Sequence, residues 1–157
     1  MTASAQQTVV VERRVAASQG RVWEAVTDLR GMPRLLAGVE SVEVLTGGSF
    51  GVGTRWRETR RMLGKRATEE MTVTESEPPE RYVTVAASHG MHYTSELRLI
   101  PAGPQATTVR MAFTARPASG RPLGLLGRLV APLGSKAVAR ALAKDLADIA
   151  RAIESTG

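Results

Sequence analysis

The segment SKAVARALAKDLADIARAIE, residues 135–154, carries large apolar side chains at spacings of three and four. They are Val138, Leu142, Leu146, Ile149 and Ile153. This period places them in one stripe along a helix, while the charged Lys144, Asp148 and Arg151 fall mostly elsewhere. A long helix gains most of its stability by burying such a stripe. We therefore predict a long C-terminal helix that packs against a large apolar surface.

The chain before this helix supplies a sheet. Between Val39 and Arg116 nearly every segment alternates in polarity; in 54–62, for example, Trp56, Glu58 and Arg60 share one face. The predicted strands cover a segment around 42–44 and residues 54–62, 66–75, 81–88, 91–100 and 107–115. Consecutive strands with short turns form a meander, which predicts an antiparallel sheet with one buried face.

A further strand and two short helices precede the meander. Residues 9–15, VVVERRV, form a β-branched run typical of a strand. Ser18 can cap a helix that extends to about Leu29, and Pro33 opens a second short helix through Leu36. The predicted fold class is thus α+β, with a seven-stranded antiparallel sheet around a long C-terminal helix.

The apolar segment 117–134 keeps helical spacing, but glycines and prolines interrupt it. It either leads into the last helix or forms the first half of one long broken helix. Its leucines, Leu123 to Leu133, could insert at a membrane interface, although a cavity lid or core packing is the favoured role.

Size and composition predict one domain. The chain has 157 residues with 43% apolar content, which fits a single domain over 8–157 after a flexible tail at 1–7. That tail is too short and polar for a signal peptide, so we expect a cytoplasmic protein. The chain has no cysteine and two histidines, which excludes thiolate chemistry and disfavours imidazole metal sites. We predict no metal and no cofactor.

The net charge of +6 raises the question of an anionic partner. The arginines are scattered and aromatic residues make up 4%, which disfavours nucleic acid. Around the turn at Gly64, Arg60, Arg61, Lys65 and Arg66 form a basic hairpin tip. This tip either contacts an anionic membrane peripherally or is simply solvated. We expect a monomer or homodimer.

Four segments resemble one known superfamily. They are VERRVAASQGRVWEAVTDLRGMPRLL (11–36), GVGTRWRE (51–58), PPERY (78–82) and DLADIARAIE (145–154). Together they resemble the START-like (SRPBCC) superfamily, which includes the birch-pollen allergen, lipid-transfer domains and the polyketide cyclase/dehydrase family. The resemblance implies a helix-grip fold, with a cavity between a curved sheet and the C-terminal helix.

The inward faces of the predicted elements would line this cavity. The predicted lining residues are Trp23, Leu36, Trp56, Glu58, Met71, Val85, Tyr93, Met111, Phe113, Leu126, Leu142 and Ile149. The favoured function is binding or carriage of a small hydrophobic ligand, lipid or polyketide-like. An aromatase/cyclase-like enzyme in which Glu58 or Tyr93 transfers protons is the alternative, and a regulator acting through its basic surface is a third hypothesis.

Other polar residues leave alternatives open. Glu58 and Arg60 could form an internal ion pair, or Arg60 could reach water at the strand end. Glu69 stands near Glu58 if it faces the same way as Met71; otherwise it balances arginines across the sheet. The histidines flank Gly90 in SHGMHY (88–93), which indicates a polar hairpin turn rather than a catalytic pair, since Ser88 and His89 would point to opposite faces.

Overall fold

The structure is a computed structural model that describes residues 7–62, 64–88, 90–118 and 125–156, with side chains described in 7–61, 64–88, 90–118 and 135–156. The elements are β1 (Gln7–Val15), α1 (Gln19–Thr27), the 3₁₀ helix η1 (Leu29–Gly31), α2 (Met32–Leu35), β2 (Val39–Val44), β3 (Arg55–Met62), β4 (Lys65–Glu77), β5 (Arg81–Ser88), β6 (Met91–Gly103), β7 (Ala106–Pro117) and α3 (Leu125–Glu154).

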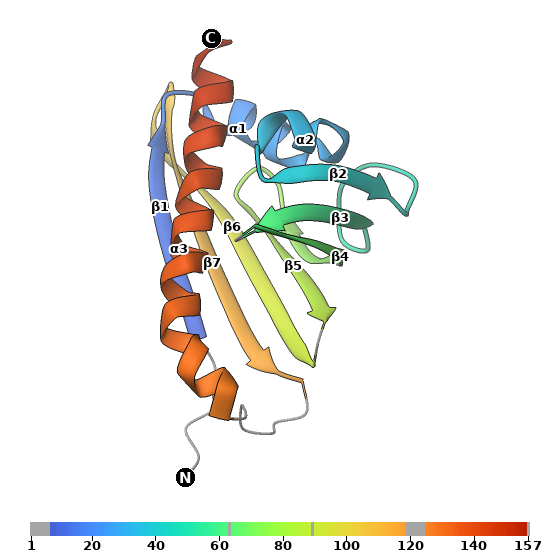
Figure 1. The fold of residues 1–157 in the computed structure, drawn as a ribbon. Coiled ribbons are helices and arrows are strands. Elements are labelled where there is room, and N and C mark those ends of the chain that lie inside the picture. The colour runs from blue at the N-terminus through green and yellow to red at the C-terminus, as the bar shows by residue number, and fades with distance from the viewer. Residues whose placement is uncertain (1–6, 63, 89, 119–124, 157) are drawn as a thin grey trace.

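Within the described residues, seven strands form one antiparallel sheet in the order β1-β7-β6-β5-β4-β3-β2. The curved sheet wraps around α3, which runs lengthwise beside β1, and the short helices close one end (Figure 1). Neighbours in sequence pair along the meander, as the short turns require. The predicted helix-grip fold is confirmed.

The short helices follow the predicted capping chemistry. The Ser18 side chain accepts a hydrogen bond from the Arg21 backbone N–H at 3.3 Å. The predicted first helix is shorter than expected because Asp28 ends α1 and caps η1, accepting from the Gly31 N–H at 3.1 Å. A Cβ at Gly31 would lie 2.3 Å from the Asp28 carboxylate, so a larger residue there would displace this cap.

The last helix starts at Leu125 rather than at Ser135. Of the two alternatives for the apolar segment, the structure shows the single long helix, with Pro132 and Gly134 inside it. The side chains of residues 125–134, including that of the predicted cavity residue Leu126, lie outside the described part, as do residues 119–124 altogether. Among the described residues, no helix is both long and apolar enough to cross a bilayer.

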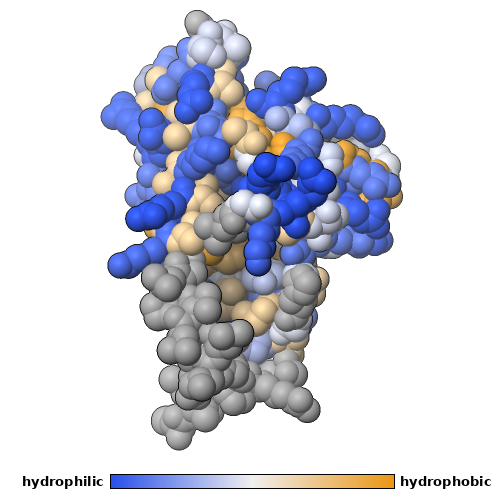
Figure 2. Space-filling view, in the orientation of Figure 1, coloured by the Kyte–Doolittle hydropathy of each residue, from blue (hydrophilic) through white to orange (hydrophobic). Residues whose placement is uncertain are grey.

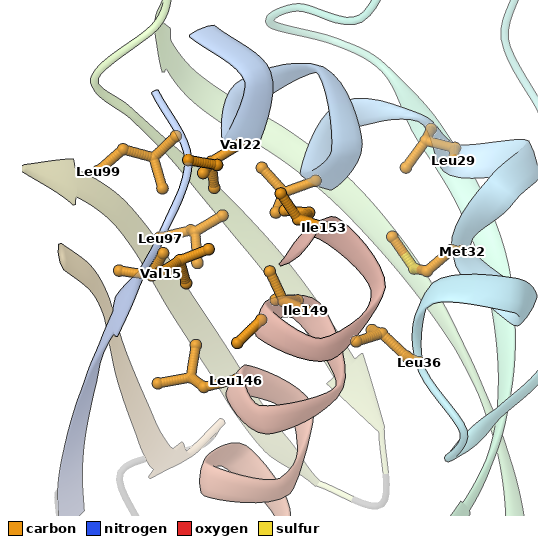
Figure 3. Packing of buried hydrophobic residues seen from close by; sticks show 14 of the residues in the cluster. Val15, Val22, Leu29, Met32, Leu36, Leu97, Leu99, Leu146, Ile149 and Ile153 are labelled. Atoms are coloured by element: carbon orange, nitrogen blue, oxygen red, sulfur yellow. The ribbon is translucent and has the colours of Figure 1, made fainter. Parts of the chain in front are cut away.

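The core lies between the C-terminal half of α3, the short helices and the sheet (Figure 3). Its central side chains are Val15, Val22, Leu97, Leu99, Leu146, Ile149 and Ile153, each 5% exposed or less. The placement of Asp148 away from the apolar stripe was wrong. Asp148 is buried, because its carboxylate accepts a hydrogen bond from the Ala37 backbone N–H at 3.0 Å and so ties α3 to the end of α2.

Candidate functional site

A cavity of about 620 Å³ lies between the middle of α3 and the concave face of the sheet. The described residues that line it come from β1, α2, all strands from β3 to β7 and α3. They are Gln7, Met32, Leu36, Trp56, Glu58, Arg60, Ala67, Glu69, Met71, Tyr82, Thr84, Ala86, Met91, Tyr93, Ser95, Glu96, Leu97, Met111, Phe113, Ala115, Val138, Leu142 and Asp145. In Figure 2 apolar residues are visible between α3 and the hydrophilic β3–β4 hairpin.

The position of the core explains why this space stays open. α3 packs along β1, and its C-terminal turns bury Leu146, Ile149 and Ile153. Further toward its N-terminus the helix presents Val138 and Leu142, which are half-buried and face the cavity. Opposite them the sheet presents mostly small or flexible side chains such as Ala86 and Met71, which do not fill the gap.

An ion cluster bridges the sheet and the helix at this cavity. Arg60 Nη1 donates to Asp145 Oδ2 at 2.8 Å, and Arg60 Nε donates to Glu58 Oε1 at 3.0 Å. The other Glu58 oxygen accepts from Trp56 Nε1 at 3.2 Å. The predicted internal ion pair between Glu58 and Arg60 is therefore present, and Asp145 is a second acidic partner.

Burial and charge oppose each other in this cluster. Burial lowers the pKa of Arg60, but Asp145 and Glu58 outweigh it, so the net direction is upward and the guanidinium stays charged. Burial raises the pKa of Asp145 and Arg60 lowers it, but the nearby charges of Glu58 and Asp148 add to the rise, so the net direction is also upward. The cavity thus disfavours the charge on Asp145 even beside its arginine partner.

A second polar group occupies the adjoining strands β4, β5 and β6. The Ser88 hydroxyl donates to Glu69 Oε1 at 2.8 Å, and Glu69 lies opposite Glu58 in the β3–β4 register. Burial raises the pKa of Tyr93, and the Glu69 charge adds to the shift while a hydrogen bond with Ser88 opposes it. The Tyr93 ring stacks on Phe113 with centroids 5.7 Å apart. A carboxylate bonded to a serine hydroxyl and a stacked pair of aromatic rings are therefore both present on this side of the sheet.

An aromatic cluster borders the cavity at the end closed by the short helices. Phe50 contacts the rings of Trp23, Trp56 and Tyr82 at centroid distances of 6.3, 6.5 and 4.9 Å. The Tyr82 hydroxyl donates to the Val26 carbonyl oxygen at 3.3 Å, and burial, followed by the Glu58 charge, raises its pKa. Tyr82 is thus a neutral, hydrogen-bonded part of the wall.

The structure brings most of the predicted lining residues to the cavity. Those on its wall are Leu36, Trp56, Glu58, Met71, Tyr93, Met111, Phe113 and Leu142. Three other predicted residues do not lie on the described wall. Trp23 packs into the aromatic cluster, and Ile149 is part of the core. Val85 points to the other side of the sheet: side chains alternate along a strand, and its neighbours Thr84 and Ala86 face the cavity.

Sequence reasoning missed Asp145 and underrated Arg60 and Glu69. Asp145 follows Leu142 by three positions, which places it beside the apolar stripe, so its spacing was a usable signal. His92 is exposed beside the predicted turn at Gly90, whose φ is 75°, and His89 lies outside the described residues. In the part of the chain that the structure describes, no three His, Asp or Glu side chains are placed to hold a metal ion.

Solved structures with the same fold span nearly the whole chain. TTHA0849 from Thermus thermophilus has a TM-score of 0.80 at 22% identity, covering 96% of this chain and 99% of its own. A START superfamily protein from Mycobacterium smegmatis has 0.79 at 15%, covering 96% and 99%. The Zhui aromatase/cyclase from Streptomyces sp. R1128 has 0.80 at 19%, covering 95% and 94%. At these identities the likeness shows the fold alone.

Sequence comparison identifies the family. A search of curated proteins finds no match. The sequence model described as "Polyketide cyclase / dehydrase and lipid transport" matches residues 6–154. That range runs from the start of β1 to the end of α3 and so includes the entire cavity wall. The chain therefore belongs to the polyketide cyclase/dehydrase and lipid transport family.

Proposed function

We propose that this protein binds a small, mainly apolar molecule of the lipid or polyketide type in its cavity and carries it shielded from water. The observation that supports this most directly is the unfilled space of about 620 Å³ beneath α3. This volume is typical of small-molecule sites. A ligand that buries apolar surface there gains roughly 25 cal/mol per Å².

The polar groups of the wall suit orientation of such a ligand. Arg60, Glu58 and Asp145 form a charged cluster at one part of the wall, and Glu69, Ser88 and Tyr93 form a second polar group. Most of the remaining wall is apolar. A molecule with an apolar body and few polar atoms would therefore enter in a restricted set of orientations.

Filling the cavity tests the proposal. Ala86 lines the cavity on β5, and Ala87 beside it is exposed on the opposite face. We expect Ala86→Trp to weaken binding of the neutral fluorescent probe N-phenyl-1-naphthylamine at least about tenfold, because the indole occupies the ligand's space. Ala87→Trp should leave binding unchanged. Equal binding by both variants, at similar thermal stability, would place the probe elsewhere and contradict the proposal.

A second candidate function is proton transfer in ring closure or dehydration of a polyketide-like substrate. Tyr93 favours it, since its hydroxyl lies near Ser88 and the Glu69 charge on the cavity wall. Glu58 suits this role less well, because Arg60 and Trp56 already occupy both of its oxygens.

Tyr93→Phe separates this candidate from simple carriage. The phenylalanine ring keeps the stacking on Phe113 and lacks the hydroxyl. If the protein is an enzyme of this kind, the variant should bind a polyketide-like substrate as the wild type does and turn it over about 10² times more slowly. Turnover can be followed by mass spectrometry of the product. Unchanged turnover would remove Tyr93 from the chemistry.

A further inference from the structure

The charge of the cavity wall is opposite to that of the whole molecule. The chain carries a net charge of +6, yet Glu58, Glu69, Glu96 and Asp145 all touch the cavity. Among the described lining residues, Arg60 carries the one positive charge. The interior of the site is therefore acidic, which opposes ligands with a carboxylate or phosphate group.

Three of these carboxylates already have cationic partners. Glu58 and Asp145 share the single Arg60 guanidinium, at 3.0 and 2.8 Å. Glu96 accepts hydrogen bonds from Arg81 and Arg98. The wall thus contains structural ion pairs that account for these residues without a ligand.

Glu69 differs from the other three. Among the described residues it takes part in no ion pair, and its hydrogen bond comes from the neutral Ser88 hydroxyl. It is half-buried on β4, facing the cavity, whereas its neighbour Glu70 is exposed on the opposite face and paired with Arg55 and Arg57. The carboxylate beside the apolar space therefore has unused acceptor capacity.

Two aromatic rings line the same cavity as this carboxylate. Tyr93 lies within range of the Glu69 charge, and the stacked Tyr93 and Phe113 rings both line the cavity. An aromatic ring attracts a cation placed over its face, and a carboxylate accepts charge-assisted hydrogen bonds from an ammonium group. A cavity that holds a carboxylate and aromatic rings thus has the chemistry that recognises a protonated amine.

We infer that the ligand of this cavity is an apolar molecule with a protonated amine, and that the amine binds at Glu69, in the cavity that Tyr93 and Phe113 also line. This inference rests on the proposed binding function and specifies its ligand. The body of the ligand occupies the apolar wall between Met71, Met111 and Leu142. The amine supplies the positive charge that the wall lacks at Glu69.

A series of ligands with one hydrocarbon body tests this inference. Decylamine, 1-decanol and decanoate compete with N-phenyl-1-naphthylamine for the purified full chain at pH 7, below their micellar concentrations. We expect decylamine to bind about tenfold more tightly than 1-decanol, and decanoate to bind weakest. The net charge of +6 would favour the opposite order, so general electrostatics cannot produce this result.

Two neighbouring substitutions locate the effect. Glu69→Gln keeps the shape and removes the charge, so it should bring decylamine to the affinity of 1-decanol and leave 1-decanol unchanged. Glu70→Gln, on the exposed face, should preserve the tenfold preference. Equal binding of amine and alcohol by the wild type, tighter binding of decanoate, or the same loss in both variants would overturn the inference while the carrier function stands. If no compound displaces the probe, both fail.

Discussion

Leu146→Ala is expected to lower the free energy of unfolding by about 3 kcal/mol. Leu146 is 1% exposed and belongs to the core that also contains Val15 and Ile149. Truncation removes buried methyl groups and leaves a void that the surrounding side chains cannot close. Equilibrium unfolding in urea, followed by circular dichroism, measures the change.

Leu142→Ala provides the matched control on the same helix. Leu142 lies one turn before Leu146 but faces the cavity and is half-buried. Its truncation enlarges a space that is already open, so we expect a loss of about 1 kcal/mol or less. A loss as large as that of Leu146→Ala would show that the helix is packed solidly there and would contradict the presence of the cavity.

Arg60→Met is expected to lower the free energy of unfolding by about 3 kcal/mol at pH 7, because it leaves Glu58 and Asp145 without their shared cation. The side chains of Arg60 and Asp145 are 21% and 5% exposed, so solvent screens Arg60 only partly. Methionine retains much of the apolar stem, so the loss arises from charge rather than volume. Thermal and urea unfolding at fixed pH measure it.

The loss from Arg60→Met should shrink as the pH falls from 7 toward 4. Burial already raises the pKa of Asp145 from 3.8, and removal of the guanidinium raises it further. At pH values between the pKa of Asp145 in the unfolded chain and its higher pKa in the folded chain, the folded state binds more protons, so the folded state is stabilised as the pH decreases. This gain is larger in the variant, so the loss becomes smaller. Arg61→Met, next in sequence, is the control. Arg61 is 64% exposed and pairs with Glu40 at the surface, so Arg61→Met should change the free energy of unfolding by no more than about 0.5 kcal/mol at every pH.

Strand β3 shows what the sequence could predict. Its charges and its tryptophan alternate strictly, so Trp56, Glu58 and Arg60 could be assigned to one face from the sequence alone, and all three line the cavity. The same reasoning predicted the antiparallel order and the C-terminal helix. Alternation and helical period are local signals, and they are strong where polar and apolar residues differ clearly.

Strand β5 shows why other positions could not be assigned. In VTVAAS (83–88) small and apolar residues occupy both faces, so nothing in the composition distinguishes Val85 from Ala86. The positions of Trp23 and Ile149 depend on how far the cavity extends along α1 and α3, which is a property of tertiary packing. The importance of Glu69 depended on its having no basic partner among the described residues, which only side-chain contacts reveal.

The division of α3 has a consequence for how this protein can change over generations. Its C-terminal turns, with Leu146, Ile149 and Ile153, hold the fold, while Val138 and Leu142 face the open space. Selection removes substitutions in the first group because they destabilise the fold, whereas those in the second group change the stability little. Selection can therefore reshape what the cavity accepts while the scaffold is inherited intact.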